Sequence, residues 1–163
     1  MKKYLSLIFL FFPALFFLLF LIVSFYNQYF WIEKSAANNH IELFLIAIFG
    51  LIGTIGGILD WQYHRIVLKL KISKKERKAE SQALGIGGIS MFILMISASV
   101  FDQERGMFLI PVIIVLIYTV SLICYDEFVF HRVRCGKKET IYHRMLVFGN
   151  GLAWLSWFKL LYV

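Results

Sequence analysis

Five long hydrophobic runs divide the chain, and short polar segments separate them. A run of about 18 or more apolar residues is long enough for a helix to cross a bilayer. Lipid permits only helices or closed barrels, and these runs lack the alternation of barrel strands. We therefore predict an all-α integral membrane protein, a five-transmembrane-helix bundle that forms a single membrane domain over residues 1–163. The predicted spans are about residues 4–31, 41–64, 83–101, 107–131 and 141–162.

The composition supports this class. Hydrophobic residues make up 60% of the 163 positions and the mean hydropathy is +0.75, whereas soluble domains contain about 45–50% apolar residues. An ordinary soluble domain and a disordered chain are therefore excluded. The first run is much longer than the 7–15 residues of a signal peptide core, so we predict a retained span rather than a cleaved leader.

The positive charge is distributed unevenly. If the N-terminus is cytoplasmic, fourteen of the 17 Lys and Arg residues fall on the inner side, and only Lys34, Arg105 and Lys159 on the outer side. This bias predicts a multi-pass protein of the cytoplasmic (inner) membrane with its C-terminus outside. The net charge of +7 is concentrated in loops such as residues 69–78, which suits contact with anionic lipid. No motif supports nucleic acid as a partner.

A short motif occurs three times with the spacing acid-x-x-aromatic-His-Arg, and three of the six arginines belong to it. On a helix, residues i and i+4 lie on one face, so each copy would present a carboxylate beside an imidazole. The copies are Asp60-Trp61-Gln62-Tyr63-His64-Arg65, Glu127-Phe128-Val129-Phe130-His131-Arg132 and Glu139-Thr140-Ile141-Tyr142-His143-Arg144.

The predicted topology brings the three copies to one height, at the cytoplasmic ends of spans two, four and five. Glu80, at the inner start of span three, is expected to join them; Asp126 neighbours Glu127, but the spacing favours Glu127 as the inward carboxylate. Ionisable side chains in or near a membrane are costly and are functional candidates. The predicted metal ligands are Asp60, His64, Glu80, Glu127, His131, Glu139 and His143. Tyr63 and Tyr142 are predicted as catalytic hydrogen-bond donors beside them.

This ligand set suits a centre of two metal ions, iron first, with manganese or zinc as alternatives. It is similar to di-iron four-helix bundles in ligand type and placement only, because those proteins use Glu-x-x-His. Three other interpretations stay open. One metal could bind the three histidines, with the carboxylates orienting them. Haem would use one or two of the histidines, and a metal-free cluster would form a salt-bridged cap on the bundle.

The first functional hypothesis is an oxidase, hydroxylase or desaturase that acts on a lipid or quinone. A zinc-dependent membrane hydrolase is the alternative chemistry, and metal transport or sensing and a structural subunit are the non-enzymatic alternatives. Outer halves that are apolar except for Asn150 argue against transport. The arginines that follow the histidines are predicted to hold an anionic substrate headgroup, or simply to contact lipid phosphates; they are Arg65, Arg132 and Arg144.

Glycines are concentrated in spans two and three. Small residues let helix backbones approach closely in lipid, so we predict a tight contact between these two spans. A homo-oligomer through span two is the alternative. The glycines are Gly50, Gly53, Gly56 and Gly57 in span two, and Gly85, Gly87 and Gly88 in span three.

Overall fold

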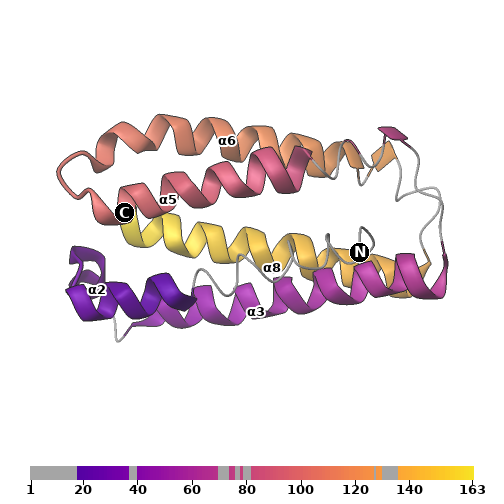
Figure 1. Ribbon diagram of the computed structural model, residues 1–163, viewed down its shortest axis with the longest axis horizontal. Helices are drawn as coiled ribbons and strands as arrows, with labels where there is room; N and C mark the ends of the chain where they lie inside the picture. Colours follow the sequence, from indigo (N-terminus) through magenta and orange to yellow (C-terminus); the bar gives the residue numbers. More distant parts are fainter. Residues whose placement is uncertain are drawn as a thin grey trace. The chain divides into compact units, whose positions relative to one another are not determined.

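The computed structural model describes residues 18–36, 40–69, 74–75, 78, 82–126, 128–129 and 136–163. All regular structure among these residues is helical, so the prediction of an all-α chain is confirmed for them. Figure 1 shows the helices in chain order. A helix over Leu18–Asn27 is followed by α2 (Phe30–Ala36), α3 (Ile41–Gln62), the π-helix η1 (Tyr63–Val67), the π-helix η2 (Gln82–Ile89), α5 (Ser90–Val100), α6 (Arg105–Asp126) and α8 (Lys137–Tyr162).

Two helices in the described part are long and apolar enough to cross a membrane. They are Ile41–Val67, which comprises α3 and η1, and Arg105–Asp126, which is α6. They coincide with predicted spans two and four, which gives weak support for a membrane protein.

The five-span bundle is not supported by the described helices. The apolar helices Leu18–Asn27 and Gly85–Val100 are shorter than a bilayer crossing requires, and the beginning of predicted span one lies outside the described residues. Helix α8 has 26 residues, but Asn150 and Lys159 interrupt its apolar stretch.

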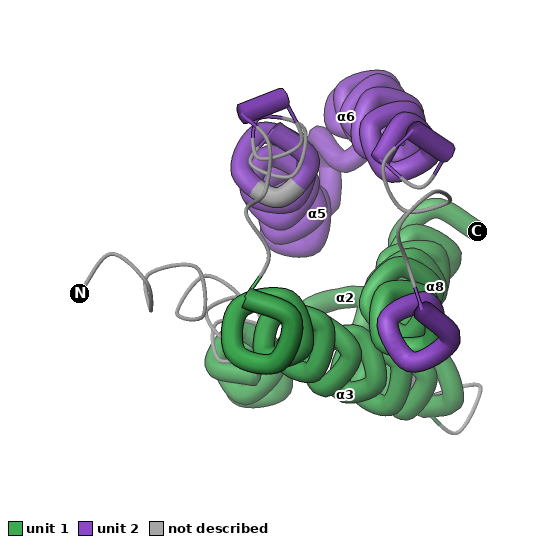
Figure 2. Tube along the Cα trace, turned by 90° about the vertical axis from the view of Figure 1, so that its right-hand side faces the viewer, with its two compact units in different colours: residues 1–69, 141–163 green, residues 70–140 purple. Residues whose placement is uncertain are grey.

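The described helices fall into two compact units (Figure 2). Unit 1 comprises residues 1–69 and 141–163, and unit 2 comprises residues 70–140. Unit 1 therefore holds α3, η1 and all of α8 after its first turn, whereas unit 2 holds η2, α5 and α6. The division does not test the predicted single membrane domain.

In unit 1, α3 and α8 run side by side and touch through glycine. A Cβ atom on Gly53 would lie 2.8 Å from the backbone nitrogen of Asn150, and one on Gly56 would lie 2.5 Å from that of Leu146. A Cβ on Gly149 would collide with the backbone of Gly53. The glycines of span two were expected to contact span three; these two instead pack against the helix of predicted span five, because Gly149 supplies the matching small residue there.

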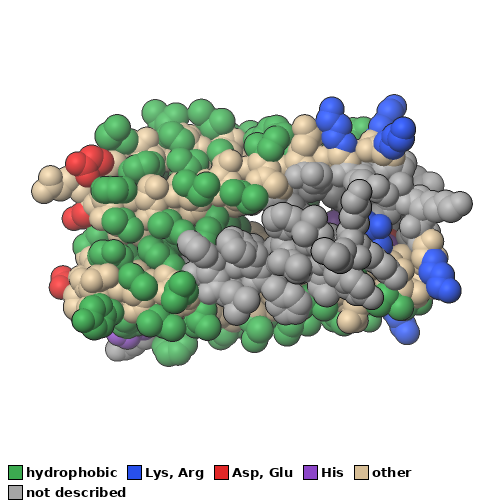
Figure 3. Space-filling model, viewed as in Figure 1, with side chains coloured by type: hydrophobic (Ala, Val, Ile, Leu, Met, Phe, Trp, Pro, Cys, Tyr) green, Lys and Arg blue, Asp and Glu red, His purple; other side chains and the backbone are tan. Residues whose placement is uncertain are grey.

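In unit 2, α5 and α6 form a helical hairpin (Figure 1). Phe101 stacks on Phe108 at the turn, with ring centroids 6.5 Å apart. Gly87 of η2 packs against the side chain of Thr119 of α6. Only 6% of the most apolar 18-residue stretch of α6 is buried. Many hydrophobic side chains lie on this part of the surface in Figure 3. Such a surface suits contact with lipid.

Among the described residues, seven hydroxyl side chains donate a hydrogen bond to the carbonyl four residues earlier in their own helix, at 2.7–3.2 Å. This arrangement satisfies a hydroxyl without water, as an apolar environment requires. The donors are Ser24, Thr54, Ser99, Thr119, Ser121, Thr140 and Ser156.

Candidate functional site

The first copy of the repeated motif forms an acid–histidine pair where α3 passes into η1. Nδ1 of His64 lies 3.4 Å from Oδ2 of Asp60, and only 8% and 14% of the two side chains are exposed. The other carboxylate oxygen of Asp60 is buried and has no hydrogen-bond partner among the described residues. Because a buried carboxylate oxygen is costly to leave unpaired, Asp60 is suited to bind a cation.

The histidine of this pair belongs to a π-helical turn. The N–H of Leu68 donates to the carbonyl of Tyr63 at 2.9 Å, five residues earlier. Turns of this kind are rare and occur frequently at functional sites. The sequence analysis expected an ordinary helix here, because the i, i+4 spacing of Asp60 and His64 is compatible with both forms and gives no separate signal for the π-helix.

The third copy lies on α8. The Glu139 residue is fully buried and His143 is 9% exposed. One helical turn separates them, so they lie on the same face of α8. Charged side chains are rarely buried unless they are paired or bind a metal. The burial of both members distinguishes this copy from a solvated pair on a helix surface.

The contacts between α3 and α8 follow a single antiparallel register. Glu42 pairs with Lys159, Gly53 meets Gly149, and Gly56 meets Leu146. Further along, the rings of Tyr63 and Tyr142 meet edge to face, with centroids 6.0 Å apart and an interplanar angle of 73°.

The same register places Asp60 of α3 level with His143 of α8. Unit 1 therefore brings together residues from the first and third copies: an acid–histidine pair on one helix, a histidine on the other, and the two tyrosines that precede these histidines. All three copies were predicted at one height, and the Tyr63–Tyr142 contact relates the first and third copies in this way.

Three predicted ligands and one predicted headgroup arginine belong to segments that the structure does not describe. Glu80, Glu127, His131 and Arg132 lie outside the described residues. Asp126, the last residue of α6, is 7% exposed and belongs to unit 2. The sequence analysis preferred Glu127 over Asp126 as the inward carboxylate, and the i, i+4 spacing gave no means of finding the burial of Asp126.

The predicted headgroup arginines in the described part differ in exposure. Arg65 lies in η1 and is partly buried, whereas Arg144 is exposed on α8. Each follows its histidine directly, so it points about 100° away from that histidine around the helix. The two arginines therefore cannot share the histidine face.

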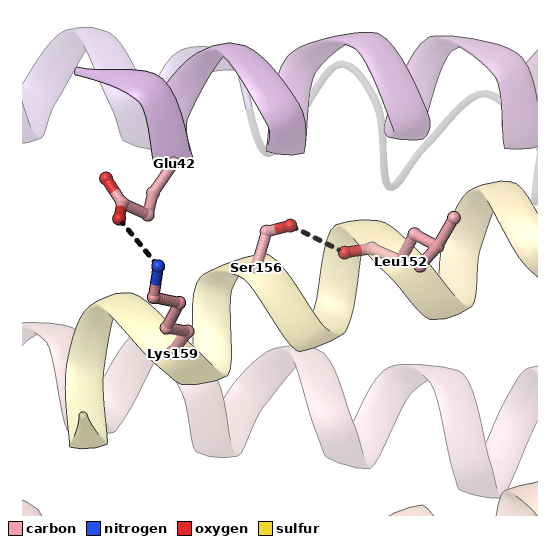
Figure 4. A network of polar contacts seen from close by, with 4 residues as sticks. All are labelled: Glu42, Leu152, Ser156 and Lys159. Atoms are coloured by element: carbon pink, nitrogen blue, oxygen red, sulfur yellow. Dashed lines mark hydrogen bonds and ion pairs between the residues drawn. The ribbon is translucent and has the colours of Figure 1, made fainter. Parts of the chain in front are cut away.

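The opposite end of unit 1 carries a polar pair that the sequence analysis missed. Figure 4 shows Glu42, in the first turn of α3, beside Lys159, near the end of α8. Oε1 of Glu42 and Nζ of Lys159 are 3.3 Å apart, with the glutamate side chain 6% exposed and the lysine side chain 62% exposed. Only the charge of residue 42, at the head of an apolar run, could have drawn attention to it.

No group of three or more His, Cys, Asp or Glu side chains placed to hold a metal ion occurs among the described residues. Comparisons of the chain with protein families, curated proteins and solved structures found no match. The functional argument therefore rests on the chemistry and placement of the two motif copies in α3, η1 and α8.

Proposed function

We propose that the chain is a multi-pass protein of the cytoplasmic membrane that binds metal through its acid–histidine motifs. Three observations support placement in a membrane. They are the two long apolar helices, the exposed apolar surface of α6, and the hydroxyl groups that donate hydrogen bonds within their own helices. A cytoplasmic N-terminus follows from the positive-inside rule. Five spans would require Leu18–Asn27, Gly85–Val100 and α8 to cross the membrane as well.

The observation that carries the metal proposal is the register that sets Asp60 level with His143. In this proposal Asp60, His64 and His143 of unit 1 are ligands on α3, η1 and α8. Nδ1 of His64 lies beside Asp60, so the two side chains would share a metal bound between them, or His64 would bind through Nε2 while Asp60 orients its ring. Nitrogen and oxygen ligands of this kind suit iron, manganese or zinc.

A second metal ion would need ligands from the remaining motif copy. Glu127 and His131 of that copy are the proposed source, with Glu80 as a separate carboxylate, and together they would complete a di-iron-type centre. With two irons the centre would activate O2 for oxidation, hydroxylation or desaturation of a lipid or quinone. With zinc it would polarise a substrate for hydrolysis. Tyr63 and Tyr142 would act as hydrogen-bond donors next to the ligands.

The absence of a three-ligand group among the described residues favours one rival, a metal-free polar cap. In that case the acid–histidine pairs would serve only to close the ends of the helices. Metal transport and metal sensing are variants in which a metal site exists without catalysis. A structural subunit of a membrane complex would use the cluster for stability or partner association, without metal.

Elemental analysis of detergent-purified protein tests the proposal. We expect about two equivalents of iron or manganese, or about one of zinc, in the wild type, and loss of the metal in His143→Ala. His40→Ala is the matched control, because His40 precedes α3 at its other end. Equal metal content in all three proteins, or none in any, would refute the site. An absorbance change on exposure to O2 would separate oxidative from hydrolytic chemistry.

A further inference from the structure

Helix α8 has two faces of different character. The packed face is formed by buried residues such as His143, Gly149 and Trp157; Gly149 meets Gly53 of α3, and the ring of Trp157 lies beside Phe20. On the other side every third or fourth residue is exposed, which places these residues on one stripe of a helix with 3.6 residues per turn. This α8 stripe consists of Ile141, Arg144, Phe148, Leu152 and Leu155, and it ends before Lys159, which pairs with Glu42 of α3.

One cation interrupts the apolar part of the α8 stripe. Arg144 lies between exposed Ile141 and Phe148, one turn away on either side. No ion pair to Arg144 occurs within the part of the chain that the structure describes. The acidic residue nearest to it on α8, Glu139, is buried and lies on the opposite side of the helix.

Arg144 places a positive charge well inside helix α8, away from its N-terminal end. The residue lies seven positions after the start of α8, which corresponds to about 10 Å along the axis at 1.5 Å per residue. By the antiparallel register it is level with Ile58, inside the apolar helix Ile41–Val67. A guanidinium at such a depth is costly unless it reaches the interface or pairs with an anion.

We propose that the α8 stripe binds an anionic phospholipid, with its phosphate paired to Arg144 and an acyl chain along Phe148, Leu152 and Leu155. A guanidinium pairs with phosphate through two parallel hydrogen bonds. The apolar residues of the stripe follow Arg144 toward the C-terminus, which is the direction in which an acyl chain would enter the bilayer. The lipid phosphate therefore supplies the negative charge that pairs with Arg144 on this face.

This inference rests on the proposed placement of α8 in a membrane but requires no metal. Tightly bound lipid would lie beside the proposed metal ligands without sharing their face of α8.

Native mass spectrometry of the full chain in nonionic detergent tests the inference. Phosphatidylglycerol and phosphatidylcholine with the same acyl chains are added in equal amounts, and the bound lipid is counted. We expect the wild type to retain phosphatidylglycerol preferentially. Because one basic residue contributes about 1 kcal/mol to binding of anionic lipid, Arg144→Gln should lower the preference about fivefold. Lys34→Gln, an exposed charge change on α2, is the matched control.

An unchanged preference in Arg144→Gln, or no preference in the wild type, would overturn the inference. Displacement of phosphatidylglycerol by excess inorganic phosphate would overturn it as well, because the site would then recognise the anion alone. Arg144→Lys replaces Arg144→Gln if the latter does not fold, and a smaller drop in preference is expected. The metal content of Arg144→Gln should equal that of the wild type, so failure of the lipid site and failure of the metal site are distinguishable.

Discussion

Tyr63 and Tyr142 meet edge to face although 78 residues of chain separate them, with ring centroids 6.0 Å apart. Each tyrosine precedes the histidine of its motif copy. The contact therefore fixes the relative height of two copies that are far apart in the sequence. Two copies of the motif that are distant in sequence are therefore neighbours in the fold.

The tyrosine contact should be measurable as a coupling energy. Tyr63→Leu and Tyr142→Leu are each expected to lower the stability of the purified protein, and the double variant should lose less than the sum. An edge-to-face aromatic pair predicts a coupling of about 0.5–1.5 kcal/mol. Chemical denaturation of the four proteins in mixed micelles gives this value. Strict additivity would mean that the rings do not stabilise each other.

Gly149→Ala should strongly destabilise the contact between α3 and α8. A Cβ at this position would collide with backbone atoms of Gly53, which a side-chain rotation cannot relieve. We expect a loss of about 1–3 kcal/mol, typical of overpacking. Gly151→Ala is the matched control on the same helix, because no atom lies within 4 Å of the added Cβ. Similar thermal unfolding of the two variants would contradict the packing described for unit 1.

The pair of Glu42 and Lys159 offers a test at the other end of these helices. Lys159→Met would leave a carboxylate with a 6% exposed side chain without this cation. Since the lysine is largely exposed, the expected loss is reduced to about 1–2 kcal/mol. The double variant Glu42→Leu with Lys159→Met should recover most of that stability, because an apolar pair needs no compensation there. A double variant as unstable as the single one would show that Glu42 has another role.

The predicted topology can be tested by labelling single cysteines in whole cells. In a Cys124→Ser, Cys135→Ser background, Lys34→Cys should react with a membrane-impermeant maleimide added outside. Lys138→Cys should react only after the cells are opened. Both positions are exposed in the structure, so access is limited by the membrane alone. The reverse pattern would invert the orientation, and equal reaction of both would argue against a membrane between them.

Much of the helical fold follows from hydrophobic run length. Residues 41–64 and 107–131 were predicted as spans, and the long apolar helices Ile41–Val67 and Arg105–Asp126 lie at those positions. Run length could not show that η2 adopts a π-helical form, or that Gly53 would meet Gly149 rather than span three. The partner of a glycine depends on which distant helix offers a small residue at the same height, and that information is not local.

The candidate site also has features that could be predicted from the sequence and features that could not. The spacing of Asp60 and His64 predicted their pairing, because i, i+4 neighbours share a face of a helix. The buried state of Asp126 and Glu42 escaped prediction, since burial is decided by neighbouring helices and not by residue type. The π-helical turn at His64 was not predicted either, because the i, i+4 spacing of Asp60 and His64 is compatible with both an α-helix and a π-helix.

The hydroxyl groups that bond within their own helices have a consequence for the order of assembly. Each of these helices completes its hydrogen bonding before it meets a neighbour, so helix formation and helix association can be separate events during biosynthesis. The candidate site is different: Asp60 and His64 pair within one helix, but the rings of Tyr63 and Tyr142 meet only after the helices α3 and α8 have come together. A nascent chain would therefore acquire its stable helices first and its site chemistry last.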